Sequence, residues 1–290
     1  MGEVVGAALL SHVATIMLPE TTRRELNNGE DFSLVPGLHR LKAEVLDRID
    51  YDTVLVFDSH WATTVEFVIA AHEHRSGLFT SDELPRGMRQ VHYDYPGDPE
   101  LAHTIAELAG KHGTRGTAIN DPLLPVHYPT INLLKYLQKD DESWVSIGVC
   151  QTAETEDYMR IGRAVGDAIA QLDRKVLLIA SGAMSHRFWP LSVLHNYEAA
   201  DPAFIRTAEA RAADEERIAW FEQGDHAGVL RTMPEFREFK PEANFGHYLM
   251  MASAMGGESW EWRGRRFSEY ENALGTGQIH MWFDPPTASS

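Results

Sequence analysis

The chain has 290 residues, and its 43 acidic side chains against 26 basic ones give a formal net charge of −17. A chain this acidic argues against broad binding to a nucleic-acid backbone and against adhesion to an anionic membrane face. Hydrophobic residues make up 43% and charged residues 24%, which are globular proportions, so extensive disorder is not expected. Its one cysteine, Cys150, can form neither an internal disulfide nor a cysteine-based zinc cluster.

No targeting or membrane-spanning segment is predicted. The apolar run 4–10 follows an acid and is too short for a signal peptide, and no stretch approaches the ~18 apolar residues of a transmembrane helix. No repeat, long linker or break in composition divides the chain. We therefore expect a cytoplasmic protein with a single domain over residues 1–290.

Strand-like and helix-like segments alternate along the chain. Six apolar runs predict buried strands, at 4–10, 53–57, 67–71, 144–149, 176–180 and 279–283. Helices are predicted from Asp98 to about Gly110 or Gly113, over 158–172, over 204–223 as an exposed helix, and over 247–255 as a buried one. This order predicts an α/β fold, with a central mostly parallel or mixed sheet flanked by helices. The last of these runs, 279–283, has a second interpretation, as an exposed apolar segment available for packing or for an interface.

Three of the 14 histidines directly follow apolar strand runs. His12 ends VVGAALLSH, His60 ends TVLVFDSH and His186 follows VLLIASGAMSH. Ligands collect at the carboxyl ends of strands in open α/β sheets, so parallel strands would bring these histidines to one edge, where the active site is expected. Asp58 is interpreted either as an acceptor that orients His60 or as a strand-end cap.

Neutral imidazole is the commonest protein ligand for metals, and two histidines with one carboxylate leave open positions on Fe(II). Glu242, in FKPEANFGHYLMM, is the best candidate for the carboxylate because it lies among apolar and aromatic residues. A single histidine at a strand end is more often structural than a ligand, and a single acid in such a loop is more often solvated. On these residues alone, a metal site and a set of ordinary structural residues both remain open.

The remaining signals are weaker. Six histidines in helical or charged surroundings are expected at the surface, namely His72, His74, His92, His103, His112 and His226. The chain contains no nucleotide-binding glycine motif, no HExxH and no GxSxG. Cys150, inside a strand run, is interpreted as a packed small hydrophobe.

Four short motifs, in this order, resemble those of the type III extradiol ring-cleavage dioxygenases. They are SHVATIM at His12, FDSHW at His60, SGAMSHRF at His186 and PEANFGHYLMM at Glu242. The resemblance covers essentially the whole chain. TSDELP at 80–85, YPGDPELA at 95–102 and GTGQ at 275–278 also look like the homoprotocatechuate branch of that family.

The resemblance implies that His12, His60 and Glu242 hold Fe(II), that His186 is the acid/base, and that His127 is a second active-site histidine. The segment around His127 departs from the Asp-His-Gly-x-x-x-Pro-Leu pattern of the protocatechuate enzymes. Val126, Tyr128 and Asn132 replace the Asp, Gly and Pro. These departures leave the substrate open.

The implied reaction inserts O2 beside the two hydroxyls of a catechol and gives a muconic semialdehyde, with no organic cofactor. The expected partners are a small catecholic substrate and O2, without nucleic acid or membrane, and the family suggests a homo-oligomer. A carboxylate-bearing catechol such as 3,4-dihydroxyphenylacetate is expected, with protocatechuate, gallate or its methyl ether, and aminophenols as alternatives. Four residues are candidate substrate contacts, with Arg187 a possible carboxylate clamp: Arg187, Tyr128, Trp189 and His195.

Two other functions stay open on the sequence. One is a binding protein like the Memo-type relatives of these dioxygenases, which share the fold and act in signalling. The other is a zinc hydrolase using the same three ligands.

Overall fold

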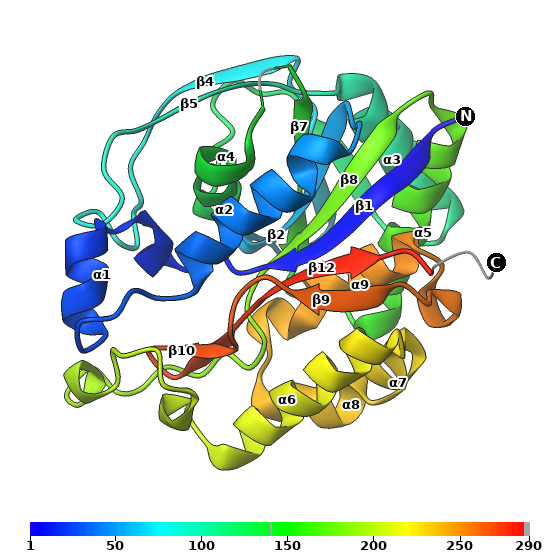
Figure 1. Cartoon of the computed structure of the whole chain (residues 1–290). Helices are drawn as coiled ribbons and strands as arrows, with labels where there is room; N and C mark the ends of the chain where they lie inside the picture. The colour runs from blue at the N-terminus through cyan, green and yellow to red at the C-terminus, as the bar shows by residue number, and fades with distance from the viewer. Residues whose placement is uncertain (140, 287–290) are drawn as a thin grey trace.

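The centre of the computed structural model is an eight-stranded mixed sheet (Figure 1). The model describes residues 1–139 and 141–286. The strands lie in the order β6-β3-β7-β2-β8-β1-β12-β9. Their bounds are β1 (Glu3–Leu10), β2 (Thr53–Thr63), β3 (Phe67–Ala70), β6 (Gly116–Ile119), β7 (Ser143–Cys150), β8 (Lys175–Ser181), β9 (Arg263–Arg266) and β12 (His280–Asp284).

The four strands at the middle of the sheet, β7, β2, β8 and β1, run parallel to one another. Antiparallel strands complete one side, where β12 pairs with β1 and β9 pairs with β12. On the other side β3 pairs antiparallel with β7 and parallel with β6. The expected mixed sheet is confirmed, and the parallel strands end at a common edge.

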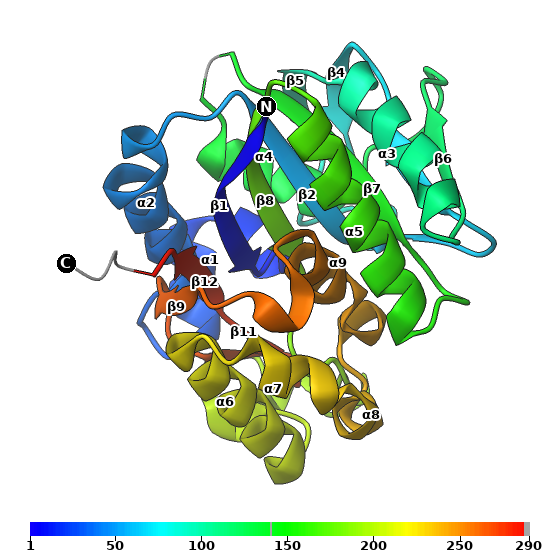
Figure 2. The same cartoon turned by 90° about the vertical axis from the view of Figure 1, so that its right-hand side faces the viewer.

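Helices cover both faces of the sheet, as the continuous apolar strands require. One face packs against α2 (Leu34–Glu44) and α4 (Tyr128–Leu137). The other packs against α3 (Pro99–Lys111), α5 (Thr155–Gln171) and α9 (Gly246–Ala254). Figure 2 shows α2 on one side of β1 and β8 and α5 on the other.

The remaining elements surround this three-layer core. They are α1 (Glu20–Leu26), α6 (Ala208–Gln223), α7 (His226–Arg231), α8 (Met233–Phe236), the ribbon of β4 (His74–Phe79) with β5 (Val91–Pro96), and the ribbon of β10 (Glu271–Ala273) with β11 (Thr276–Gln278). No helix in the described residues is long and apolar enough to cross a membrane.

The predicted helix starts and ends are mostly confirmed. Asp98 caps α3 by accepting the backbone N–H of Leu101, at 3.0 Å. The helix over 204–223 was predicted too long and too exposed. Thr207 caps α6, and the face of the helix that carries Asp214 and Arg217 is buried.

Two expectations about exposure were wrong. The apolar residues of β12 are buried, because Met281 and Phe283 pack into the core on one face of the sheet and Trp282 into the core on the other. His226 is fully buried, with its ring stacked on Trp260 at 3.6 Å and its nitrogens within 2.8 Å of the Tyr248 hydroxyl and a backbone carbonyl. His72 is also buried. Tertiary contacts hold both rings, at His72 through Nε2, which lies 2.7 Å from the backbone carbonyl of Asp121. The local sequence carries no signal of these contacts.

A buried carboxylate links the start of α2 to β10. Glu271 accepts hydrogen bonds from the backbone N–H and the hydroxyl of Ser33, at 3.0 and 2.6 Å, and is 3% exposed. Burial raises the pKa of Glu271 to about 7, against the opposing effect of these hydrogen bonds.

Because that pKa is above its value in the unfolded chain, the folded state binds more protons and loses stability as the pH rises from about 4.5 to about 7. Glu271→Gln removes this titration. We expect the free energy of unfolding of the variant, relative to wild type, to rise between pH 5 and pH 8 by up to about 3 kcal/mol. Chemical denaturation at both pH values measures it, and the exposed Glu269→Gln serves as control. A difference that stays constant with pH would contradict the prediction.

Candidate metal centre

His12 lies just past the end of β1, beside the end of the parallel strand β8. Its Nδ1 is 3.0 Å from the hydroxyl of Ser181, the last residue of β8. Its backbone carbonyl accepts the side-chain amide of Asn132, at 2.6 Å. Asn132 therefore fixes the His12 loop against α4. With Nδ1 occupied, Nε2 is the nitrogen left to face the cavity.

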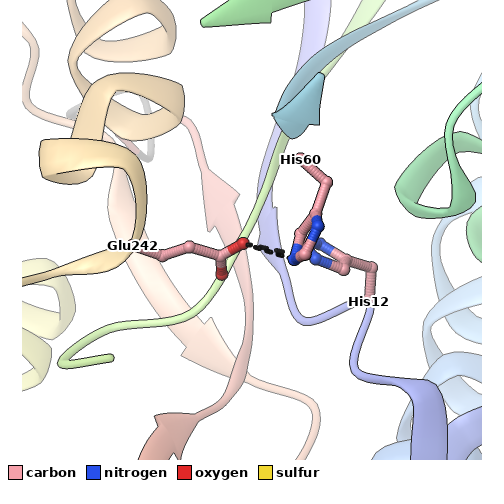
Figure 3. A group of neighbouring side chains, drawn as sticks. All are labelled: His12, His60 and Glu242. Carbon is pink, nitrogen blue, oxygen red and sulfur yellow. Dashed lines mark ion pairs between the residues drawn. The ribbon is translucent and has the colours of Figure 1, made fainter. Parts of the chain in front are cut away.

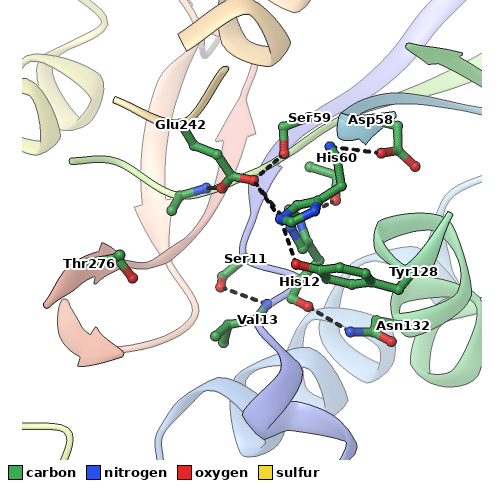
Figure 4. Close-up of polar contacts among 12 residues, drawn as sticks. Ser11, His12, Val13, Asp58, Ser59, His60, Tyr128, Asn132, Glu242 and Thr276 are labelled. Carbon is green, nitrogen blue, oxygen red and sulfur yellow. Dashed lines mark hydrogen bonds and ion pairs between the residues drawn. The ribbon is translucent and has the colours of Figure 1, made fainter. Parts of the chain in front are cut away.

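His60 lies on a bulge inside β2, where the sequence suggested that the strand had already ended. Asp58 pairs with Gly148 of β7, but the next paired residue is Ala62, so three residues stand out of register. The Asp58 carboxylate accepts the backbone N–H of His60 at 3.1 Å (Figure 4). It also accepts the backbone N–H of Trp61, at 2.9 Å. Asp58 thus shapes the backbone of the bulge, and both of its earlier interpretations were incomplete.

Gly148 gives the bulge its space on the neighbouring strand. A Cβ at this position would lie 2.6 Å from the carbonyl oxygen of Trp61, closer than real side chains approach. The position of His60 therefore depends on a residue about ninety positions away along the chain.

Glu242 begins a short 3-10 turn, Glu242–Phe245, that leads into α9. Its carboxylate is 5% exposed and accepts hydrogen bonds from the Ser59 hydroxyl and the Ala183 backbone N–H, both at 2.5 Å. The three residues that follow it, Ala243, Asn244 and Phe245, all have positive φ, between 48° and 61°. This conformation costs free energy for residues with a Cβ, and such strain occurs most often at functional sites.

The three side chains converge on a common point (Figure 3). Oε1 of Glu242 lies 3.4 Å from Nε2 of His12 and 3.5 Å from Nε2 of His60. One potential ligand atom from each of the three residues lies within 4.8 Å of the others. The sequence prediction that these residues meet at the sheet edge is therefore confirmed.

The protonation of this group suits a cation. Burial lowers the pKa of His60 to about 4, so its imidazole is neutral at physiological pH and can ligate. Burial alone would raise the pKa of Glu242, but the neighbouring His12 and His186 side chains and a hydrogen bond with His12 hold that pKa well below its usual range. Two imidazoles with one carboxylate are a set of ligands that binds divalent metals.

A cavity of about 270 Å³ opens on one side of the three residues. Tyr128 and His186 are among its lining residues, as the sequence predicted for each. The Tyr128 hydroxyl lies 2.5 Å from Nε2 of His60 (Figure 4). Burial raises the pKa of this phenol, so it stays protonated and acts as a donor.

A buried network holds the segment that leads to His186. Asp214 accepts the backbone N–H and the hydroxyl of Ser185, at 3.0 and 2.6 Å, and the hydroxyl of Tyr270, at 2.6 Å. The backbone N–H of His186 donates to the carbonyl of Lys240, at 3.0 Å. His186 and Glu242 are therefore positioned by the same stretch of backbone.

The other predicted site residues lie outside this cavity lining. The ring of His127 stacks on Trp61 at 5.6 Å and lines a neighbouring cavity. Arg187 is exposed and donates to the backbone carbonyl of Glu238, at 3.0 Å. Trp189 stacks on Tyr197, and His195 is exposed.

Several lining residues were not singled out from the sequence. The motif TSDELP contributes Glu83 and Leu84, and GTGQ contributes Thr276 and Gln278. Both motifs appeared in the sequence analysis only as marks of resemblance. Phe188, the last residue of the motif SGAMSHRF, also lines the cavity, as does Glu198, which carried no signal.

The family model of the catalytic LigB subunit of aromatic ring-opening dioxygenases matches residues 6–282. The chain belongs to this family. The match includes every residue of the candidate metal centre and confirms the type III extradiol dioxygenase resemblance.

Two curated relatives extend this result. The chain is 29% identical over 265 residues to a 3,4-dihydroxyphenylacetate 2,3-dioxygenase of Escherichia coli, covering 90% of this chain and 93% of the relative. It is 24% identical over 271 residues to the 2-aminophenol 1,6-dioxygenase beta subunit of a Pseudomonas species, covering 88% and 86%.

The crystal structure of the E. coli K12 protein JW3007 has a similar fold, with a TM-score of 0.60 and 14% identity over 96% of this chain and 98% of that one. This likeness concerns the fold alone. The family match and the curated relatives identify an extradiol ring-cleavage dioxygenase, which favours the enzyme over a Memo-type binding protein.

The geometry predicts that divalent metal binding stabilises the folded protein. At about a hundredfold excess over Kd, Fe²⁺ or Mn²⁺ added without oxygen should raise the Tm by about 5 °C. His12→Ala and Glu242→Ala should lose most of this shift, and His195→Ala, at an exposed histidine outside the cavity, should retain it. Thermal unfolding with and without a chelator measures the shift. An unchanged shift in both site variants would mean that the metal binds elsewhere.

Proposed function

We propose that this protein is a non-haem Fe(II) dioxygenase that cleaves the ring of a catechol beside its two hydroxyls, using O2. The observation that carries the proposal is the convergence of two imidazole nitrogens and one buried carboxylate at the wall of a partly apolar cavity. The product would be a muconic semialdehyde.

His12, His60 and Glu242 are the proposed iron ligands. Two histidines and a carboxylate on one side of the ion leave positions on the other side for substrate and O2. Ferrous iron supplies the one-electron chemistry that lets a closed-shell aromatic react with triplet O2. The hydrogen bonds from Ser59 and Ala183 keep the Glu242 carboxylate aimed at the imidazoles before metal arrives.

Tyr128 is the proposed hydrogen-bond donor to the substrate. Its hydroxyl lies against Nε2 of His60, which is the ligating atom in this proposal. When that lone pair binds metal, the buried hydroxyl needs another acceptor. A catechol oxygen in the adjoining cavity would satisfy it and fix the orientation of the ring.

His186 is the proposed acid/base. It lines the cavity, and the backbone segment that carries it also donates to Glu242. An imidazole there would take the proton of the second catechol hydroxyl and later return one. Leu18, Leu84 and Leu274 line the same cavity and would limit the access of water to the reacting ring.

The proposal predicts ring cleavage that depends on iron. Protein loaded with Fe²⁺ should consume one O2 per catechol and form a yellow product, whereas zinc-loaded protein should not. His186→Gln should lower kcat by about 10²- to 10⁴-fold without preventing metal binding. An oxygen electrode and product absorbance make the measurement. Activity restricted to zinc-loaded protein, on an ester or amide, would favour the hydrolase instead.

A second prediction compares the contributions of Tyr128 and its neighbour His127 to catalysis. Tyr128→Phe removes only the hydroxyl and should lower kcat/KM by about 10- to 100-fold. His127→Gln tests the role that the family resemblance implies for His127. We expect a smaller loss, because the His127 ring lies against Trp61 and outside the cavity lining. Steady-state kinetics with one catechol compares the two, and a larger loss at His127 would restore its implied catalytic role.

The names of the relatives suggest 3,4-dihydroxyphenylacetate as one candidate substrate and an aminophenol as another. The carboxylate clamp expected from Arg187 has no support in the geometry, since the Arg187 guanidinium donates to Glu238 outside the lining. A cytoplasmic location and a homo-oligomeric state stay predictions from the sequence.

A further inference from the structure

We infer that the ring substituent accepted by this cavity is uncharged or cationic and is not a carboxylate. The inference rests on the proposed function and concerns the part of the cavity that would hold the substituent. It differs from the activity in the name of the E. coli relative, whose substrate is an anion.

The charged side chains that line the cavity are acidic. Besides Glu242 they include Glu83 and Glu198, and no lysine or arginine is among the lining residues in the described part of the chain. An Fe(II) ion bound by Glu242 and a catecholate would be close to neutral as a unit. Glu83 and Glu198 are then the charges that a substituent would meet.

Neither of these two carboxylates is paired with a cation from the described residues. The Glu83 carboxylate lies 3.6 Å from Nδ1 of His60, a proposed metal ligand, and pairs with no lysine or arginine of the described residues. No ion pair or hydrogen bond from the Glu198 side chain is found within residues 1–139 and 141–286. The Glu83 side chain is 48% exposed and Glu198 is half-buried, so solvent partly screens their negative charges, which still oppose an anion and favour a cation at this cavity.

The basic residues nearest to the lining segments along the chain have other contacts. Arg23 pairs with Asp31 at 2.7 Å and Arg24 with Glu20 at 2.8 Å, and the Arg187 guanidinium donates to a backbone carbonyl. The Arg206 guanidinium lies 4.2 Å over the ring of Trp189. Arg86 and Arg89, on either side of the lining residue Gly87, are exposed and are the remaining candidates that an experiment must test.

The rest of the lining suits a hydrocarbon substituent. Six apolar side chains contribute to it: Val13, Leu18, Leu26, Leu84, Phe188 and Leu274. A carboxylate placed among them would lose its hydration and gain no charged partner. An alkyl group would bury apolar surface there, and an aminoalkyl group could also reach a glutamate.

The test uses three catechols of matched length that differ in charge: 4-propylcatechol, 4-(2-aminoethyl)catechol and 3-(3,4-dihydroxyphenyl)propionate. With iron-loaded protein we expect kcat/KM for the anion to be at least about tenfold below that of the neutral compound, and the cation to be at or above the neutral one. Binding of the same compounds without oxygen should be weakest for the anion, which should have the highest Kd of the three.

Charge-removing variants identify the cause. Glu198→Gln and Glu83→Gln should each reduce the difference in kcat/KM between the neutral and anionic compounds. High salt should reduce this difference further, because it screens the charges. Arg86→Gln, Arg89→Gln, Arg187→Gln and Arg206→Gln should leave the ranking of the three compounds unchanged. A higher kcat/KM for the anionic compound than for the neutral one would overturn the inference, most clearly if one of the arginine variants abolished that preference. The dioxygenase proposal would remain intact. Failure to cleave all three compounds, with iron bound, would count against the proposed function itself.

Discussion

The arrangement of this site depends on holding one buried carboxylate against two imidazole nitrogens. An isolated buried carboxylate is costly, and the Glu242 oxygens are stabilised by two short hydrogen bonds and by the nearby imidazoles. Each of the three side chains comes from a different part of the chain. The parallel strands β1, β2 and β8 bring the two histidines and the donors together, and the turn before α9 supplies the carboxylate.

Local conformations that cost stability occur where this convergence requires them. The bulge in β2 interrupts the pairing with β7 and is held by Asp58 and accommodated by Gly148. Three consecutive residues with positive φ follow Glu242. Neither feature is needed to form an eight-stranded sheet. The bulge orients His60 and the turn orients Glu242, which are both proposed metal ligands. This distribution is what is expected of a fold that gives up some stability for a functional site.

Much of this could be predicted from the sequence. Apolar strand runs ending in histidine, together with the rule for parallel sheets, predicted that His12 and His60 lie close together. Glu242 was chosen for its apolar and aromatic surroundings, and the family resemblance implied the set of three. What could not be predicted depends on contacts between distant residues. The bulge at His60 needs a glycine on the neighbouring strand, and the burial of His226 depends on Trp260 and Tyr248.

The sequence also could not show which of two adjacent residues, His127 or Tyr128, faces the metal centre. The two are adjacent at the start of α4. Tyr128 lines both the cavity beside the metal centre and the neighbouring one, with its ring 5.3 Å from that of His12, whereas His127 lines only the neighbouring cavity. A motif match locates the segment and leaves open which of two neighbours faces the metal centre. The charge of the cavity was likewise hidden, since Glu83 and Glu198 come from separate segments that meet only in the folded protein.

The most direct test of the central claim is a crystal structure of the iron-loaded protein, with anomalous diffraction collected on both sides of the iron absorption edge. The account predicts one iron peak within about 2.0–2.2 Å of Nε2 of His12, Nε2 of His60 and a carboxylate oxygen of Glu242, with the opposite side facing the cavity. An iron peak bound by other residues, or full iron loading with none at this position, would contradict it.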